Sequence, residues 1–181
     1  MEKKDLKPAG VFKYFEEICQ VPRPSKKEEK IIAYLKAFGV KHNLETNVDE
    51  AGNVLIKKPA TPGKENLQTV ILQSHIDMVC EKNNDVQHDF LTDPIETEID
   101  GEWLKAKGTT LGADNGIGVA TELAILADDN IEHGPLECLF TVDEETGLTG
   151  AFELKEGFMS GDILLNLDSE DEGEIFIGCA G

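Results

Sequence analysis

The stretch GTTLGADNGIGVATELAILADDNIEHGPLECLFTV, residues 108–142, decides the fold class because it holds a glycine-rich turn, a helix and a strand in succession. Within it, IGVATELAIL at residues 117–126 is typical of a buried helix, and LECLFTV at residues 136–142 is typical of a buried strand. TVIL at residues 69–72 is another short β-prone run, ahead of the glycine-rich turn. Strand, helix and strand in this order predict an α/β fold with a partly parallel sheet and helices on its faces.

Two helices are expected before this region, and two more strands around it. VFKYFEEIC at residues 11–19 has apolar side chains at helical spacing, and a proline-containing stretch then stops the helix. Ser25 and Glu28 have the spacing of a capping box, which predicts a second helix that Gly39 closes. The further strands are expected at NVLI, residues 53–56, and at ILLNL, residues 163–167. Residues 82–107 hold the only tryptophan and are expected to form hairpins or loops that carry no chemistry.

The composition describes one soluble, acidic domain. The 181 residues include 17 basic and 36 acidic side chains, which give a formal net charge of −19, and the 40% hydrophobic content is too high for a disordered acidic tail. The negative charge disfavours binding to nucleic acid and to anionic membrane surfaces. No apolar run is long enough for a membrane span or an ordinary export signal, and the four cysteines form no Cys-x-x-Cys pair. We therefore expect a cytoplasmic protein with reduced thiols.

Three of the expected strands end in side chains that can bind metal ions. TVILQ is followed by His75 and Asp77, LFTV by Asp143, Glu144 and Glu145, and ILLNL by Asp168. Because the carboxyl ends of parallel strands meet at one edge of a sheet, we expect these side chains to lie close together. No lysine or arginine lies within these three clusters, and converging carboxylates without a cation raise one another's pKa. A bound metal ion is therefore expected as the counter-charge.

The same residues also have plainer interpretations. Asp114, in the turn LGADNG, could cap the helix that follows. His75 alone could be a buried, hydrogen-bonded histidine, although an aspartate two residues along a strand, such as Asp77, commonly orients a ligand histidine. Glu144 and Glu145 could form a solvated loop tip, or one could bind the metal while the other acts as a base. Mixed imidazole and carboxylate donors favour zinc, manganese or cobalt over calcium, for which the sequence has no Asp-x-Asp-x-Asp-Gly loop.

Three motifs together resemble the co-catalytic zinc aminopeptidase and carboxypeptidase-like superfamily, and within it the aminoacyl-histidine dipeptidases. They are SHIDMVCEKN at residues 74–83, TTLGADNGIGVA at residues 109–120 and LNLDSEDEGEIFIGCAG at residues 165–181. The resemblance implies an α/β/α sandwich with a mixed, largely parallel sheet. It also implies that residues 1–181 are the N-terminal part of the catalytic domain, without the rest of that domain and without the lid and dimerisation domain.

The resemblance implies a role for each residue of the expected site. His75, Asp114 and Asp168 would bind one Zn²⁺, and Asp114 would bridge to a second Zn²⁺ held by Glu145, with Mn²⁺ or Co²⁺ as possible substitutes. Glu144 would be the general base, and Asp77 would steady His75 from behind. The bond between Asp114 and Asn115 would be a cis peptide.

The function implied by the resemblance is a cytoplasmic metallodipeptidase that hydrolyses Xaa-His dipeptides such as β-alanyl-histidine with a metal-activated water. The resemblance also implies a homodimer for the full-length family members, and a second metal site and lid that use later residues, so we expect this chain to be weakly active or inactive alone. Two alternatives stay open: a deacylase or tripeptidase of the same superfamily, and a non-catalytic acidic metal-binding module.

Overall fold

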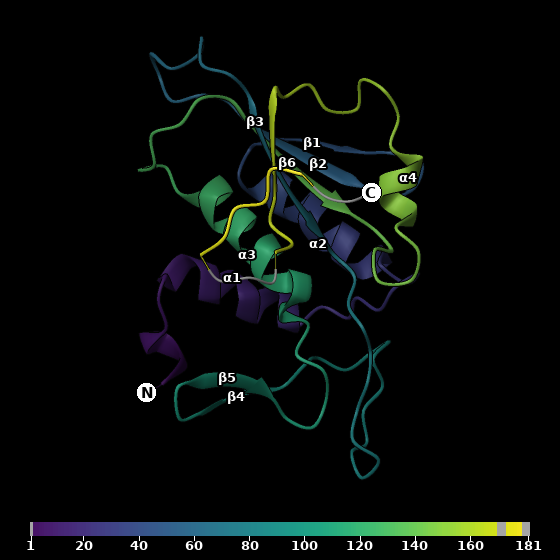
Figure 1. Ribbon diagram of the computed structural model, residues 1–181. Coiled ribbons are helices and arrows are strands. Elements are labelled where there is room, and N and C mark those ends of the chain that lie inside the picture. Colours follow the sequence, from purple (N-terminus) through teal and green to yellow (C-terminus); the bar gives the residue numbers. More distant parts are fainter. Residues whose placement is uncertain (1, 170–172, 179–181) are drawn as a thin grey trace.

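A five-stranded mixed sheet forms the centre of the computed structural model, which describes residues 2–169 and 173–178 (Figure 1). In chain order the elements are η1 (Lys3–Asp5), α1 (Ala9–Cys19), α2 (Glu29–Lys41), β1 (Glu45–Val48), β2 (Val54–Lys58), β3 (Val70–His75), β4 (Thr97–Asp100), β5 (Trp103–Ala106), α3 (Ala113–Ala127), β6 (Leu136–Thr141), α4 (Thr149–Glu153) and β7 (Ile163–Asn166). Glu170, Asp171, Glu172 and Cys179, which belong to the third motif, lie outside the described residues. None of the helices that the structure describes is long and apolar enough to cross a bilayer.

The strand order β1-β2-β6-β3-β7 brings the three site-bearing strands together. β3 pairs in parallel with β6 on one side and with β7 on the other, whereas β2 is antiparallel to both β1 and β6. Four of the five strands therefore run in the same direction, and the prediction of a mixed, largely parallel sheet is confirmed. The register pairs His75 with Thr141 and Gln73 with Asn166, so the chain leaves β3, β6 and β7 at the same edge of the sheet.

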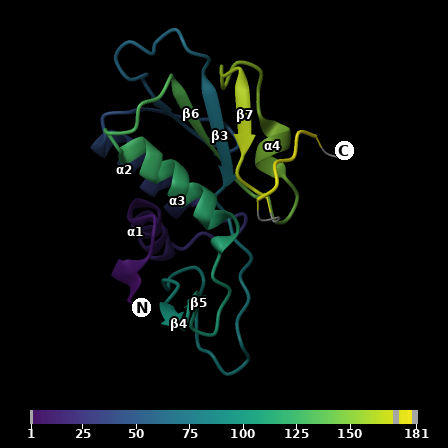
Figure 2. The same ribbon diagram turned by 60° about the vertical axis from the view of Figure 1, so that its left-hand side comes forward.

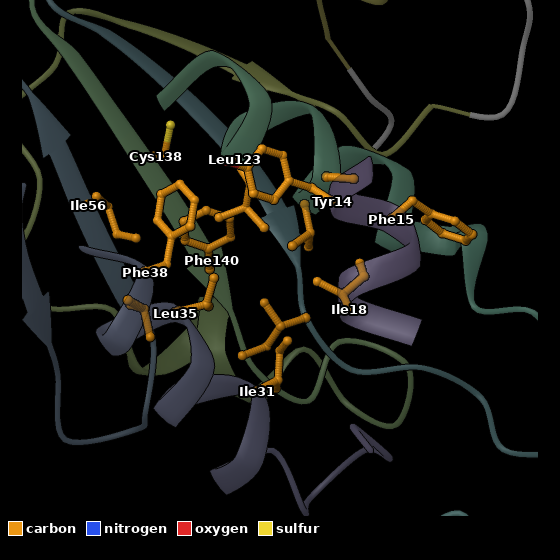
Figure 3. Packing of buried hydrophobic residues seen from close by; sticks show 14 of the residues in the cluster. Tyr14, Phe15, Ile18, Ile31, Leu35, Phe38, Ile56, Leu123, Cys138 and Phe140 are labelled. Carbon is orange, nitrogen blue, oxygen red and sulfur yellow. The ribbon is translucent and has the colours of Figure 1, made fainter. Parts of the chain in front are cut away.

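Helices cover one face of the sheet, and a shorter segment covers the other. The main core contains Phe15 and Ile18 of α1, Leu35 of α2, Leu123 of α3 and Phe140 of β6 (Figure 3), and α1 packs against α3 (Figure 2). On the opposite face Leu55, Ile71 and Leu139 form a smaller buried apolar cluster, and the chain around and after α4 packs on them with Leu154, Phe158 and Met159. Successive strand residues thus point to alternate layers, as the pleat requires.

The predicted hairpin region is confirmed, because β4 and β5 pair antiparallel within residues 82–107. This hairpin lies beside the N-terminal segment in both views of the ribbon (Figures 1 and 2). Thr97 of β4 binds both Lys3 and Glu16, which connects the hairpin to η1 and α1.

Two details of the second helix were predicted wrongly. The helix begins after Glu28, which makes no side-chain cap hydrogen bond, and Ser25 does not cap it. Gly39 lies inside α2 rather than at its end, because the helix continues to Lys41. A Cβ atom at Gly39 would overlap with the Thr46 side chain, so glycine here allows β1 to pack closely on the helix.

Candidate metal centre

His75 is the last residue of β3 and is 1% exposed. Its Nδ1 atom lies 3.2 Å from Oδ1 of Asp77, and its Nε2 atom lies 3.0 Å from Oδ1 of Asp114. The same Nε2 atom is 3.9 Å from a carboxylate oxygen of Glu144 and 3.9 Å from one of Asp168. Asp77 thus contacts the Nδ1 atom, and the Nε2 atom faces the carboxylates of Asp114, Glu144 and Asp168.

Asp114 reaches His75 from the glycine-rich turn that opens α3. Gly112 has φ +68, and Asp114 and Asn115 have non-helical backbone angles although they lie in the first turn. The bond between Asp114 and Asn115 is a cis peptide, as expected. The Asp114 side chain contacts His75 rather than an N–H of the first helical turn, so the interpretation of Asp114 as a cap is wrong. Its side chain is 66% exposed and is directed at the imidazole instead.

Asp168 completes a group of three potential ligands. It follows the end of β7 by two residues, and since Gln73 pairs with Asn166, it comes level with His75. One donor atom from each of His75, Asp114 and Asp168 lies within 4.8 Å of the others. An open hollow of about 360 Å³, lined by Asp114, Asn115, Asp168 and their neighbours, adjoins the group.

The loop after β6 brings Glu144 and Glu145 to the same place, and Asp77 fixes this loop. The backbone N–H of Glu144 donates to Oδ1 of Asp77 at 3.0 Å, and that of Glu145 donates to Oδ2 at 3.2 Å. Burial alone would raise the pKa of Asp77, but hydrogen bonds from His75, Ser25 and the Glu144 N–H outweigh it and bring the pKa to about 2. Asp77 therefore acts as a buried anion that joins the histidine to the glutamate loop, a second connection that sequence reasoning did not predict.

The remaining carboxylates repel one another. The pKa values of Glu144, Glu145 and Asp168 are all raised, first by burial and then by neighbouring carboxylates, while His75 lowers them. Burial lowers the pKa of His75, but hydrogen bonds and charge from Asp77, followed by Asp114 and Asp168, raise it to about 9. Within residues 2–169 and 173–178, no lysine or arginine forms an ion pair with these carboxylates. A divalent cation fits this donor set and would relieve the repulsion.

Sequence reasoning missed a buried cation beside this cluster, Arg23. Its side chain is 2% exposed and donates to the carbonyl oxygens of Ile76, Asp77 and Gly112. Arg23 stands far from the three acidic motifs in sequence, between two prolines, so no local pattern connects it to them.

A larger hollow, of about 460 Å³, lies at the opposite end of the strands, where Thr69 and Leu136 stand. Its one deeply buried carboxylate, Glu137, already forms an ion pair with Lys57 at 3.3 Å and accepts hydrogen bonds from Ser160. The chemistry therefore collects at the edge where the parallel strands end, as in other open α/β sheets.

Comparison with known proteins identifies a family and several relatives. Residues 71–178 match the family described as peptidase family M20/M25/M40. The chain is 53% identical over 180 residues to the cytosol non-specific dipeptidase of Escherichia coli (strain K12), a match that covers 99% of this chain and 37% of that protein.

Two solved structures extend the comparison. The aminoacylhistidine dipeptidase of Vibrio alginolyticus superposes with a TM-score of 0.95 and 55% identity over 99% of this chain and 36% of that one. The aminopeptidase PepT of Bacillus cereus superposes with a TM-score of 0.76 and 27% identity over 90% of this chain and 43% of that one. The chain thus spans little more than a third of the length of the two more similar proteins.

Proposed function

Because the chain belongs to peptidase family M20/M25/M40, we propose that it carries the metal-binding and proton-transferring residues of a metallodipeptidase. The observation that supports this most strongly is the convergence of His75, Asp114 and Asp168 from the end of β3, the first turn of α3 and the loop after β7. The proposed substrates are Xaa-His dipeptides, including β-alanyl-histidine, in line with the name of the Vibrio relative. The name of the Escherichia coli relative supports a wider range of dipeptides, so both classes belong in the test.

We propose His75, Asp114 and Asp168 as the ligands of one Zn²⁺, with Mn²⁺ or Co²⁺ as substitutes, and Asp114 and Glu145 as ligands of a second. Imidazole nitrogen and carboxylate oxygen are donors that zinc binds in catalytic sites. Asp77 supports the assignment, because its contact with Nδ1 of His75 leaves Nε2 directed at the other ligands. Zinc bound there would supply a water of lowered pKa and polarise the peptide carbonyl.

Glu144 is the proposed general base. Its carboxylate lies 3.9 Å from Nε2 of His75, and its pKa is raised by burial and by the carboxylates around it, which makes it a stronger base. It would take the proton of the attacking water and deliver it to the leaving amine. Asp77 would hold Glu144 in place through the Glu144 N–H.

We further propose that residues 1–181 form the N-terminal part of the catalytic domain, and that the homodimer contacts are made by other residues. The superposition of nearly the whole chain on about a third of the Vibrio enzyme supports this. A cytoplasmic location is proposed from the name of the Escherichia coli relative and from the free thiols of Cys19, Cys80 and Cys138.

The test uses this chain and a chimera in which the remaining residues of the Escherichia coli relative follow it. Both are titrated with zinc by calorimetry and assayed on a panel of dipeptides with and without a C-terminal histidine. We expect the chimera to hydrolyse dipeptides and the Glu144→Gln variant to bind zinc normally while kcat falls by about 10²–10⁴-fold. Asp114→Asn should weaken zinc binding in both proteins. A chimera that binds zinc but cleaves none of the panel would favour the non-catalytic metal-binding module.

A further inference from the structure

The segment between α1 and α2 contacts three of the four loops that build the candidate metal centre. Arg23, Ser25 and Glu28 each direct a side chain at these loops, and none of the three belongs to the group His75, Asp114 and Asp168. All three residues lie in the stretch from Arg23 to Glu28. Its backbone also lies beside the exit of β3, because Pro24 forms a bridge with Met78 and the Met78 N–H donates to the carbonyl oxygen of Arg23 at 3.2 Å.

Arg23 connects the loop after β3 to the glycine turn before Asp114. Its guanidinium donates to the carbonyl oxygens of Ile76 at 3.2 Å, Asp77 at 3.0 Å and Gly112 at 2.5 Å. A Cβ atom at Gly112 would come within 2.6 Å of Nη2 of Arg23, so the turn is shaped to admit this side chain. Arg23 is the only arginine in the sequence, and a buried cation whose acceptors are all neutral carbonyls is costly to keep. This cost argues for a role in the site.

Ser25 holds the buried anion at the centre of the site. Its hydroxyl donates to Oδ2 of Asp77 at 2.7 Å, and Asp77 is fully buried. The same carboxylate contacts His75 and accepts the N–H groups of Glu144 and Glu145. The position of the Asp77 carboxylate therefore affects two loops at once.

Glu28 fixes the start of the glutamate loop. It is 7% exposed, and its Oε1 atom accepts the N–H of Asp143 at 3.0 Å and that of Lys26 at 2.9 Å. Asp143 has φ +49, a left-handed conformation that needs support in a non-glycine residue. Glu144 and Glu145 follow directly, so a shift of Asp143 would move both.

We propose that Arg23, Ser25 and Glu28 are positioning residues that set the spacing of the metal ligands, by fixing the loops that carry His75, Asp114 and Glu145 relative to one another. This inference rests on the proposed metal centre. The physical reason is that a metal site tolerates ligand displacements of only about 0.5 Å. Among the residues that the structure describes, no disulfide joins the three loops and no shared strand holds them beyond the sheet edge. Hydrogen bonds behind metal ligands typically change affinity by about 10–100-fold when they are removed.

The experiment titrates this chain with Co²⁺ and records both affinity and the ligand-field absorption spectrum, which reports coordination geometry. The variants are Ser25→Ala, Glu28→Ala and Arg23→Lys, each with its folding checked by circular dichroism. Ser25→Thr and Glu28→Gln serve as conservative partners, because they keep the hydroxyl donor and the carbonyl-type acceptor. Ile56→Val, a change at a fully buried position inside β2 and outside these loops, controls for a general loss of stability.

We expect Ser25→Ala, Glu28→Ala and Arg23→Lys to weaken Co²⁺ binding by about 10–100-fold and to change the spectrum. The conservative variants should restore both, and Ile56→Val should leave both unchanged. If Ser25→Ala and Glu28→Ala bind Co²⁺ with the wild-type affinity and spectrum while Asp114→Asn does not, the inference fails and the proposed metal centre stands. If the wild-type chain itself binds no Co²⁺, the proposed metal centre is wrong, and this inference, which rests on it, is wrong as well.

Discussion

Glu122, on α3, is a buried acid with no role in the proposed chemistry. It is fully buried, and neither of its carboxylate oxygens forms a well-aligned hydrogen bond, although the Ser74 hydroxyl and the Cys138 thiol lie beside it. Burial raises the pKa of Glu122 well above its ordinary value of 4.5, and the two neighbours lower it only in part. The folded protein therefore keeps this proton at a pH where the unfolded chain has released it, and folding loses stability as the pH rises above the ordinary pKa of a glutamate.

We predict that Glu122→Met raises the free energy of unfolding by about 1–3 kcal/mol at pH 8, because it removes a buried polar group without good partners. The gain should be smaller at pH 5, where the unfolded chain is itself closer to protonated. Urea unfolding at both pH values measures this. Glu156→Gln, which removes a carboxyl group from an exposed position, is the matched control and should show no such pH-dependent gain. Equal gains from the two variants would assign the effect to net charge.

At the same scale, the sequence predicted which side chains meet but not what holds them. His75, Asp114 and Asp168 could be expected at one place because His75 and Asp168 follow apolar strand runs and Asp114 stands in a glycine-rich turn. The partners of Ser25 and Glu28 lie 52 and 115 residues further along the chain, and no local pattern encodes hydrogen bonds over such separations. The spacing of Ser25 and Glu28 instead matched that of a capping box, which is a purely local sequence signal.

Among the elements, α2 and β1 contact each other at Gly39 and Thr46. Alanine in place of glycine normally stabilises a helix interior by about 1 kcal/mol, but the added Cβ would overlap with Oγ1 of Thr46. We predict that Gly39→Ala lowers the free energy of unfolding by about 1–3 kcal/mol, and that Thr46→Ala introduced together with it recovers most of the loss. A double-mutant cycle in urea measures the coupling. Stabilisation by Gly39→Ala in both backgrounds would contradict the close packing.

Element prediction succeeded where side chains are uniformly buried. All six residues of β6 are buried, and its apolar run stands out in the sequence. β1, with the sequence ETNV, was missed because it is an edge strand whose residues are mostly exposed and polar, so neither alternation nor an apolar run marks it. The five-residue helix α4 was missed for a related reason, since a single turn carries too little periodicity to recognise.

For the whole molecule, the sequence predicted a mixed, largely parallel sheet but not the strand order. Apolar runs show where strands lie, and the intervening helix implies a parallel crossover, yet neither says that β6 inserts between β2 and β3. That insertion matters for the site, because it places the glutamate loop of β6 directly beside His75.

The net charge of −19 and the local carboxylate cluster should contribute separately to stability. Self-repulsion acts over the whole surface and is screened by salt, with a Debye length of about 10 Å at 0.1 M, whereas a bound divalent ion acts only where its ligands converge. We predict that raising NaCl from about 0.01 to 0.3 M increases the melting temperature of the wild-type chain and of Asp114→Asn alike.

At fixed salt, zinc at about 100 times its Kd should stabilise the wild type by a further ~2.7 kcal/mol, or roughly 5–10 °C in melting temperature, and Asp114→Asn by far less. Thermal scans by circular dichroism measure both effects. An equal zinc increment in the two proteins would mean that zinc binds the acidic surface at large, and the convergence of His75, Asp114 and Asp168 would then have no special affinity for it.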